Sequence, residues 1–464
     1  MSWKPTILVL VLATFGVIGA VLVWQRDLEG VGKTAGPTVV LSREQLPIDQ
    51  VTTITLRRGD EPTLVFQRSD RGWQQIEPFA HPLEMFSIRQ LLVQAAHIEV
   101  TEQLDLRELQ GARSTEALAL DPPRAELTFQ WPEGAVTLQF GRRAVAGRWY
   151  VRIRGYEHVY VASGELHDRA VEMDPKEWRD RTIFAGADVD ADQIIVQRGA
   201  DRTVLKRERK QWWMTEPVRT RLSDPARDEL FSALGRARSG GFILDQPDDL
   251  AKFGLAQPIA SIEVITTRVE SQDDELVRVE STQRLLVGAR LAIGSDDRFG
   301  MIEGRPVIVR LPKAVLRAFF GSPESLIALT ASGVVPADVK RLVIRTEQGE
   351  LRLVRDLDRW RAPEFSMEVP AGMVNELLEQ LTSLQAAQIT IREYPHELEV
   401  ATITMRGFDD VPIDTVRIAR EEGTGRWWLE NGDNVLRVFA ESLQLRLTPG
   451  DFGLQPPAPA PDTR

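Results

Sequence analysis

Residues 63–78, TLVFQRSDRGWQQIEP, carry a pattern that returns twice further along the chain. An alternating apolar and polar run, a charged turn, a Trp and a Pro recur as VLKRERKQWWMTEP at 204–217 and as LRLVRDLDRWRAP at 351–363. The residues that mark the three copies are Trp73 and Pro78, Trp212 and Pro217, and Trp360 and Pro363. Because their spacing is close to the length of an ordinary domain, roughly 100–150 residues, the pattern predicts three tandem copies of one domain.

The order of secondary-structure signals is also the same in each copy. A hairpin of alternating apolar residues precedes the Trp, and a segment with apolar residues at helical spacing follows the Pro. The predicted helices cover 82–100, 223–238 and 370–385, and short strands separated by turn residues come after each of them. The sequence therefore predicts an α+β fold in which each repeat is an antiparallel sheet with one main helix.

The predicted repeats occupy residues 48–187, 188–335 and 336–454. Within the second repeat, residues 268–280 are rich in charge and are expected to form an exposed extension of a hairpin. The tail at 455–464, QPPAPAPDTR, has too few apolar residues to build a core and is expected to be extended and disordered.

The N-terminal region contains a long segment without any charge, PTILVLVLATFGVIGAVLVW at 5–24. At a rise of 1.5 Å per residue, about 20 residues match a hydrocarbon core of about 30 Å, so this segment is expected to be a single transmembrane helix. Lys4 lies just before it, which favours residues 1–4 as a cytoplasmic tail and an extracytoplasmic location for the rest. Residues 25–47 are then a linker. A cleaved signal peptide is the alternative, although its apolar region is normally shorter.

Small residues on one side of this predicted helix could allow a second helix to approach closely. Gly16 and Ala20 are four positions apart, which is the spacing that helix pairs in lipid use. A helix without a partner would also tolerate them. The residues assigned to the membrane anchor are Thr6, Leu10, Phe15, Gly16, Ala20 and Trp24.

The composition excludes several classes of protein. A net charge of -11 argues against nucleic acid as a partner, because proteins that bind phosphate backbones usually carry an excess of basic residues. The chain has no cysteine, which excludes disulfides and thiolate metal sites. Its stability must therefore rest on packing and polar contacts.

No motif for chemistry stands out. Asp188, Asp190 and Asp192 begin like a calcium loop, but Gln193 occupies the position that requires Gly. The five histidines lack metal-ligand spacing, and there is no phosphate-binding loop and no nucleophile elbow. No catalytic, cofactor-binding or metal-binding residue is assigned, and the protein is expected not to be an enzyme. A hydrolase with carboxylates brought together by the fold is the weakest of the open hypotheses.

Cationic residues precede aromatic residues at two places, Arg209 before Trp213 and Arg426 before Trp427. If these side chains face outward on strands, they could stack on sugar rings or bind anionic headgroups. The three repeated Trp residues are more simply explained as core residues that pack under the following helix.

The segments LALDPPRAELTF at 118–129 and FGLAQPIASIEV at 253–264, together with the N-terminal anchor and the tandem Trp and Pro units, resemble domain of unknown function 4340. The second segment is similar to the family's join between helix and second sheet, which reads aromatic, Gly, Leu, Asp, any residue, Pro. In the first segment Ala119 stands in place of the Gly. The third repeat has HELEVATITM at 396–405 and lacks the motif.

This resemblance implies a bacterial inner-membrane protein whose repeats lie in the periplasm or otherwise outside the cytoplasm. Such proteins are often encoded beside ABC-2 type transporters of the gliding-motility kind, which implies an accessory or scaffold subunit with a transporter permease and the lipid bilayer as partners. The alternative is an extracytoplasmic module that binds envelope glycan or lipid. No cofactor is implied.

Overall fold

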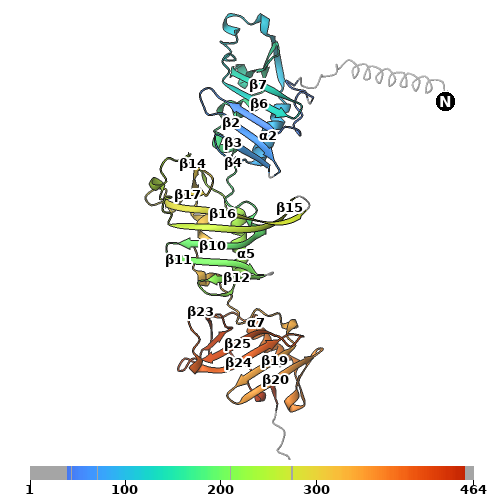
Figure 1. Ribbon diagram of the computed structural model, residues 1–464, viewed down its shortest axis with the longest axis vertical. Helices are drawn as coiled ribbons and strands as arrows, with labels where there is room; N and C mark the ends of the chain where they lie inside the picture. The colour runs from blue at the N-terminus through green and yellow to red at the C-terminus, as the bar shows by residue number, and fades with distance from the viewer. Residues whose placement is uncertain (1–38, 43, 71, 209–210, 273–274, 455–464) are drawn as a thin grey trace, which may run out of the picture. The chain divides into compact units, whose positions relative to one another are not determined.

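The computed structural model describes residues 39–42, 44–70, 72–208, 211–272 and 275–454. The chain divides into two compact units, Met1–Asp180 and Arg181–Arg464, and each is described by itself. The described residues contain three nine-stranded antiparallel sheets, one in the first unit and two in the second. The prediction of three repeated sheet units is therefore confirmed (Figure 1).

The first sheet has the strand order β4-β3-β2-β1-β6-β7-β8-β9-β5, and its main helix is α2 (Met85–Ala96). Its strands are β1 (Thr53–Arg57), β2 (Leu64–Ser69), β3 (Gly72–Glu77), β4 (His81–Pro82), β5 (Val100–Asp105), β6 (Ala125–Trp131), β7 (Gly134–Arg143), β8 (Trp149–Ile153) and β9 (His158–Ala162). Strands β1 and β6 join the two halves of the sheet at its centre.

The second sheet repeats this order strand for strand, as β13-β12-β11-β10-β15-β16-β17-β18-β14, with α5 (Asp224–Arg236) as its helix. Its strands are β10 (Ala191–Arg198), β11 (Asp201–Glu208), β12 (Gln211–Glu216), β13 (Thr220–Arg221), β14 (Gly241–Asp245), β15 (Ala260–Gln272), β16 (Glu275–Arg290), β17 (Arg298–Ile302) and β18 (Val307–Leu311). Strands β15 and β16 stay paired as far as Gln272 and Glu275, which confirms the expected hairpin extension.

The third sheet has the same order again, β22-β21-β20-β19-β24-β25-β26-β27-β23, with α7 (Ala371–Thr382). Its strands are β19 (Arg341–Thr346), β20 (Gly349–Asp356), β21 (Arg359–Ala362), β22 (Met367–Val369), β23 (Gln388–Ile391), β24 (Glu399–Arg406), β25 (Pro412–Arg420), β26 (Trp427–Glu430) and β27 (Val435–Phe439). Among the described residues of all three repeats, no helix is both long and apolar enough to cross a membrane. The expected transmembrane helix at 5–24 and the tail at 455–464 lie outside the described residues.

The three helices begin and end within the predicted ranges, but the strand that follows each helix was not predicted. Strands β5, β14 and β23 each pair with the last strand of their own sheet and form its edge. Their sequences, such as VTEQLD in β5, alternate too weakly to indicate a strand. These segments become strands because they pair with a strand far along the chain, although their own sequences do not favour one.

Each repeated Trp packs inward, as the sequence predicts. Trp73, Trp212 and Trp360 are all buried and lie on the third strand of their repeats. The ring of Trp212 meets the ring of Phe231 on α5 edge to face, with the centroids 5.0 Å apart. The helix that follows the Pro therefore covers the Trp, and this contact joins the hairpin to the helix.

An Arg lies directly opposite each of these Trp residues on the neighbouring strand, as the pairs Arg68 and Trp73, Arg207 and Trp212, and Arg355 and Trp360. The three Arg side chains reach back to the start of the first strand of the repeat or to the segment just before it. They donate to the carbonyl of Asp49 at 2.8 Å, to the carboxylate of Asp192 at 2.6 Å and to the carbonyl of Pro336 at 3.3 Å, respectively. The recurring Arg thus holds the entrance of each repeat against its first hairpin.

The motif shared by 118–129 and 253–264 also has a structural explanation. Gly254 has a φ of 66°, and Ala119 at the matching position has a φ of 54°, so both lie in the left-handed region. The turn places the carbonyl of the preceding residue against a glycine on a neighbouring strand. A Cβ on Gly288 would lie 2.2 Å from the oxygen of Phe253, and one on Gly141 would lie 2.4 Å from the oxygen of Leu118. These glycines allow the segment before the second strand group to lie flat on the sheet.

Gly288→Ala is therefore expected to lower the free energy of unfolding by about 1–3 kcal/mol, because the new methyl group has no space. Gly372→Ala is the matched control. Gly372 lies in α7 with nothing within 4 Å of an added Cβ, so the same change there should be neutral or stabilise by up to about 1 kcal/mol. Urea denaturation of both variants checks this, and equal effects at the two positions would contradict the assigned role of Gly288.

Candidate functional site

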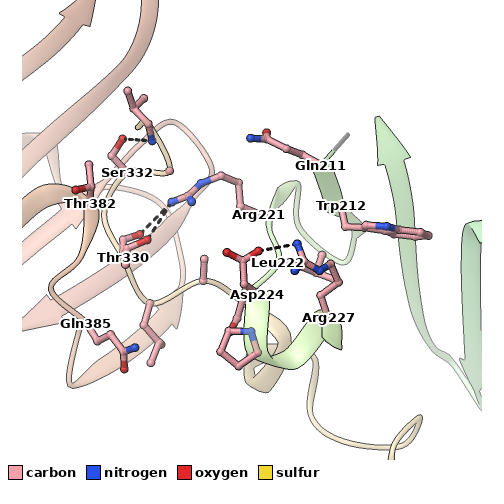
Figure 2. A pocket seen from close by; sticks show the side chains of 16 residues that line it. Gln211, Trp212, Arg221, Leu222, Asp224, Arg227, Thr330, Ser332, Thr382 and Gln385 are labelled. Atoms are coloured by element: carbon pink, nitrogen blue, oxygen red, sulfur yellow. Dashed lines mark hydrogen bonds and ion pairs between the residues drawn. The ribbon is translucent and has the colours of Figure 1, made fainter. Parts of the chain in front are cut away.

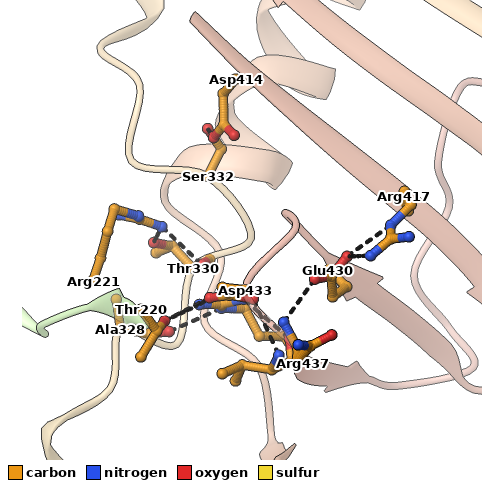
Figure 3. Close-up of polar contacts among 12 residues, drawn as sticks. Thr220, Arg221, Ala328, Thr330, Ser332, Asp414, Arg417, Glu430, Asp433 and Arg437 are labelled. Atoms are coloured by element: carbon orange, nitrogen blue, oxygen red, sulfur yellow. Dashed lines mark hydrogen bonds and ion pairs between the residues drawn. The ribbon is translucent and has the colours of Figure 1, made fainter. Parts of the chain in front are cut away.

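The second and third sheets meet through a buried polar network (Figure 3). Arg437 on β27 is fully buried, and its Nη2 donates to Oδ2 of Asp433 at 2.8 Å. Thr220 on β13 of the second sheet is also fully buried and donates from Oγ1 to the same carboxylate oxygen at 2.5 Å. Arg437 completes the connection with a 2.9 Å bond from Nε to the carbonyl of Ala328, in the segment between the two repeats.

The local chain geometry explains how Asp433 reaches this position. It lies in the turn between β26 and β27, where Gly432 and Asn434 have φ values of 82° and 55°. The other carboxylate oxygen of Asp433 accepts from the backbone N–H of Val435 at 3.1 Å and from Nη1 of Arg437 at 3.2 Å. Both oxygens are therefore bonded, as a buried carboxylate requires.

Arg221 lies next to Thr220 on β13 and crosses toward the connecting segment. Its Nη2 donates to the carbonyl of Thr330 at 3.2 Å, while its Nε is buried and has no hydrogen-bond partner. The guanidinium packs tightly against Gly333, where an added Cβ would lie 2.1 Å from Nη1. Burial, and then the charge of Arg437, lower the pKa of Arg221, although an Arg side chain stays protonated at neutral pH.

A cavity of about 540 Å³ opens on one side of Arg221 (Figure 2). It is bounded by the start of α5, by residues 328–334 and by the end of α7, and it is rich in amide and hydroxyl groups. The polar residues that line it are Gln211, Arg221, Ser223, Asp224, Arg227, Thr330, Ser332, Thr382 and Gln385. Its size is within the range of small-molecule sites, roughly 300–1,000 Å³.

A second cavity, of about 460 Å³, shares Arg221, Gln211 and Gly333 with the first but is acidic. Asp338, Asp414 and Asp433 line it. The two cavities at this junction therefore differ in charge although they share one Arg side chain.

Asp414 links the acidic cavity to the connecting segment. Its Oδ2 accepts from Oγ of Ser332 at 2.5 Å, and its Oδ1 accepts from the backbone N–H of Thr415 at 2.8 Å. Burial nevertheless raises the pKa of Asp414 above its ordinary value of 3.8, and these two bonds and the charge of Arg221 only partly offset that effect.

One of the aromatic residues assigned to a binding surface lies at this junction. Trp213 is half-buried, lines the acidic cavity, and has the guanidinium of Arg219 5.1 Å from its ring centroid. Arg209, its expected cationic neighbour, lies outside the described residues.

The other predicted surface needs a correction, because Trp427 does not face outward. Trp427 is 8% exposed and packs in the third core, and its neighbour Trp428 is 9% exposed on the opposite face, in a small cluster with Tyr394 and Leu436. Trp427 and Trp428 point to opposite faces of β26, and both faces are covered. Neither Trp ring is therefore open for stacking on a ligand. Arg426 lies near Glu421, at 3.7 Å, on the wall of a shallow cavity of about 170 Å³.

Two of the aspartates that resembled a calcium loop bind arginines instead. Asp190 pairs with Arg268 at 2.9 Å, and Asp192 pairs with Arg207 at 2.6 Å. Across the part of the chain that the structure describes, no group of three or more acidic or His residues is arranged to hold a metal ion. The anchor residues Thr6, Leu10, Phe15, Gly16, Ala20 and Trp24 precede the described part.

The sequence did not single out Thr220, Arg221, Asp433 or Arg437. One signal was available, because Arg437 interrupts the apolar strand VLRVF, and a charge at such a position indicates a buried ion pair. Thr220 is 213 positions away from its partner Asp433 and has no comparable signal.

Three sheets with the same strand order, two of them joined by buried polar contacts, define a tandem-repeat β-sheet protein. The family model described as Domain of unknown function (DUF4340) matches residues 73–242 and 212–402, which together cover more than half of the chain. The chain belongs to this family. Both matches begin at a repeated Trp, as expected for successive copies of one unit. No curated protein and no solved structure matches the chain.

Replacing Arg437 with Met is expected to destabilise the second unit by about 3–5 kcal/mol, because the Asp433 carboxylate would remain buried without its cation. The double variant Arg437→Met with Asp433→Asn should lose less, since no buried charge is left. Arg446→Met removes a partly exposed pair with Glu376 and should cost no more than about 1 kcal/mol. Denaturant unfolding of the wild-type protein and these three variants measures this, and a double variant that loses at least as much as Arg437→Met alone would contradict the cost of the unpaired buried carboxylate.

Asp414→Asn is expected to raise the melting temperature at pH 7. A carboxylate whose pKa is raised by folding costs stability when it is ionised, and this cost is absent below the unfolded value of 3.8 and complete above the raised folded value. The gain should therefore shrink as the pH falls toward 3.8.

Asp356→Asn, at an exposed carboxylate paired with Arg361, controls for the general effect of removing a negative charge. Thermal unfolding at several pH values makes the comparison. A gain for Asp414→Asn that does not change with pH would contradict burial as its cause.

Proposed function

We propose that this protein is a non-enzymatic accessory or scaffold subunit of an ABC-2 type transporter of the gliding-motility kind. In this proposal residues 5–24 anchor it in a bacterial inner membrane, and the repeats lie on the extracytoplasmic side. The observation that carries the proposal is the repetition itself: one nine-stranded sheet is built three times, and the last two copies share fully buried contacts at Thr220 and Arg437.

The buried contact between the second and third sheets favours a scaffold role over a catalytic one. Opening the contact between the second and third sheets would expose or unpair a buried ion pair, at a cost of several kcal/mol. The two copies then act as one body that can hold other proteins at a fixed separation. The transporter part of the proposal rests on the family, whose members are often encoded beside such exporters.

A second candidate is a module that binds envelope glycan or lipid. The observation in its favour is Trp213, a half-buried ring that lines a cavity together with Arg219 and Asp338. Aromatic rings at the wall of a polar cavity are typical of sites that bind sugars.

Purification of the full chain in mild detergent is expected to recover an ABC permease and its ATPase, identified by mass spectrometry. Arg437→Met should reduce this recovery if the fixed junction matters for assembly, whereas Arg446→Met should not. Repeated purifications that contain this chain alone would count against the transporter role.

Because the chain has no cysteine, a single introduced thiol can report on which side of the membrane the repeats lie. Ile293 is fully exposed, so Ile293→Cys creates a single accessible thiol. Labelling of this thiol by a membrane-impermeant maleimide in intact spheroplasts is expected, and labelling only after lysis would place the repeats in the cytoplasm.

A further inference from the structure

Arg221 carries a positive charge that no carboxylate contacts directly, although the nearby Asp414, Asp433 and Asp224 oppose it at longer range. Among the ion pairs of the described residues none includes Arg221, and its Nε has no partner. The Nε atoms of Arg284, Arg341 and Arg446 are also buried without a hydrogen-bond partner, so this atom points to a bound ion or water only together with the cavity beside it. Its contacts to Thr330 are to a carbonyl and a hydroxyl, which satisfy hydrogen bonds but supply no negative charge.

The acidic side chains around Arg221 are engaged elsewhere. Asp433 is held by Arg437 at 2.8 Å, and Asp224 is held by Arg227 at 2.8 Å. Asp414 is bonded to Ser332, and burial disfavours its ionised form. None of these three carboxylates therefore forms a direct ion pair with Arg221, and the remaining one nearby, Asp338, lines only the other cavity.

The larger cavity provides the space for a counter-ion on the side away from Asp414 and Asp433, and the one carboxylate that lines it, Asp224, is paired with Arg227. Arg221 lies on its wall together with Gln211, Gln385 and Thr330, which come from β12, the segment after α7 and the connecting segment. These side chains offer amide and hydroxyl donors along the walls of the same cavity, and of the three only Thr330 is bonded to the guanidinium. The fork of an Arg binds two oxygens of one oxyanion, and a tetrahedral phosphate has further oxygens for the remaining donors, whereas a planar carboxylate does not.

We propose that the cavity of about 540 Å³ beside Arg221 binds a phosphate group, with the guanidinium as the principal ligand and Gln211, Gln385 and Thr330 as additional donors. The cavity is larger than inorganic phosphate alone, so the group is carried on a small polar molecule or on the end of a phosphorylated envelope component. Because its walls come from both repeats, a bound phosphate also holds the second and third sheets together. This inference does not depend on the transporter role.

Isothermal titration of the full chain with inorganic phosphate and with glycerol phosphate tests the proposal. Both are expected to bind with a Kd of about 1 mM or tighter, and tighter binding of glycerol phosphate would identify an organic phosphate as the ligand. Equal affinities would identify the phosphate group alone. Absence of binding for both probes would overturn the proposal.

Arg221→Gln is expected to weaken binding about ten-fold or more, since charge-assisted hydrogen bonds are lost. Arg227→Gln is the matched control, because Arg227 lines the same cavity but is already paired with Asp224 and Asp228. It should change the Kd by no more than about two-fold. Equal losses in the two variants would show only general attraction by positive charge.

Arg221→Gln removes contacts to the connecting segment and could prevent folding. Gln385→Ala provides the independent variant, because Gln385 is exposed on the cavity rim and its loss should leave the melting temperature unchanged. It is expected to weaken phosphate binding a few-fold. Unchanged binding in both Arg221→Gln and Gln385→Ala would place the phosphate elsewhere.

Discussion

The ion pair of Arg437 and Asp433 is the interaction on which the junction of the second and third sheets depends. Removing two charges from water is expensive, and the cost is offset only when nearly every hydrogen-bonding group finds a partner. Here Thr220 and the carbonyl of Ala328 supply partners from the second repeat and from the connecting segment. A shift of one sheet against the other would break several of these bonds together. The cavities on either side of Arg221 keep their shape because this network is specific in distance and direction.

Comparison of the three copies separates the residues of the fold from those of the site. The Trp under the helix and the Arg opposite it occur in every copy, and both act inside their own repeat. The position of Arg221 differs: at the same register Pro82 stands in the first sheet and Glu368 in the third. A cation at this point is therefore a property of the second repeat alone. The three repeats share one architecture. The cation at the junction comes from a single position on the short edge strand β13, which differs from copy to copy.

The sequence predicts well what depends on near neighbours. The Trp residues, the helices and most strands follow from local periodicity, because each packs against elements a few tens of residues away. The junction could not be predicted, because Thr220 and Asp433 are far apart in the chain and become partners only after both sheets have formed. Trp427 shows a related difficulty. Alternation along β26 indicates that Trp427 and Trp428 point to opposite faces, but it does not reveal that Tyr394 and Leu436 cover the second face as well.

The net charge of -11 bears on how an anion would reach Arg221. An acidic protein repels phosphate at long range, but at physiological ionic strength this field is screened beyond about 8 Å. Binding is then decided by the few groups within the cavity, where Arg221 is the cation without a paired carboxylate. The cavity on the other side, lined by Asp338, Asp414 and Asp433 as well as Arg219, is less favourable to an anion at close range. Arg221 therefore presents a binding face to one cavity only, and the asymmetry follows from how the carboxylates are distributed around it.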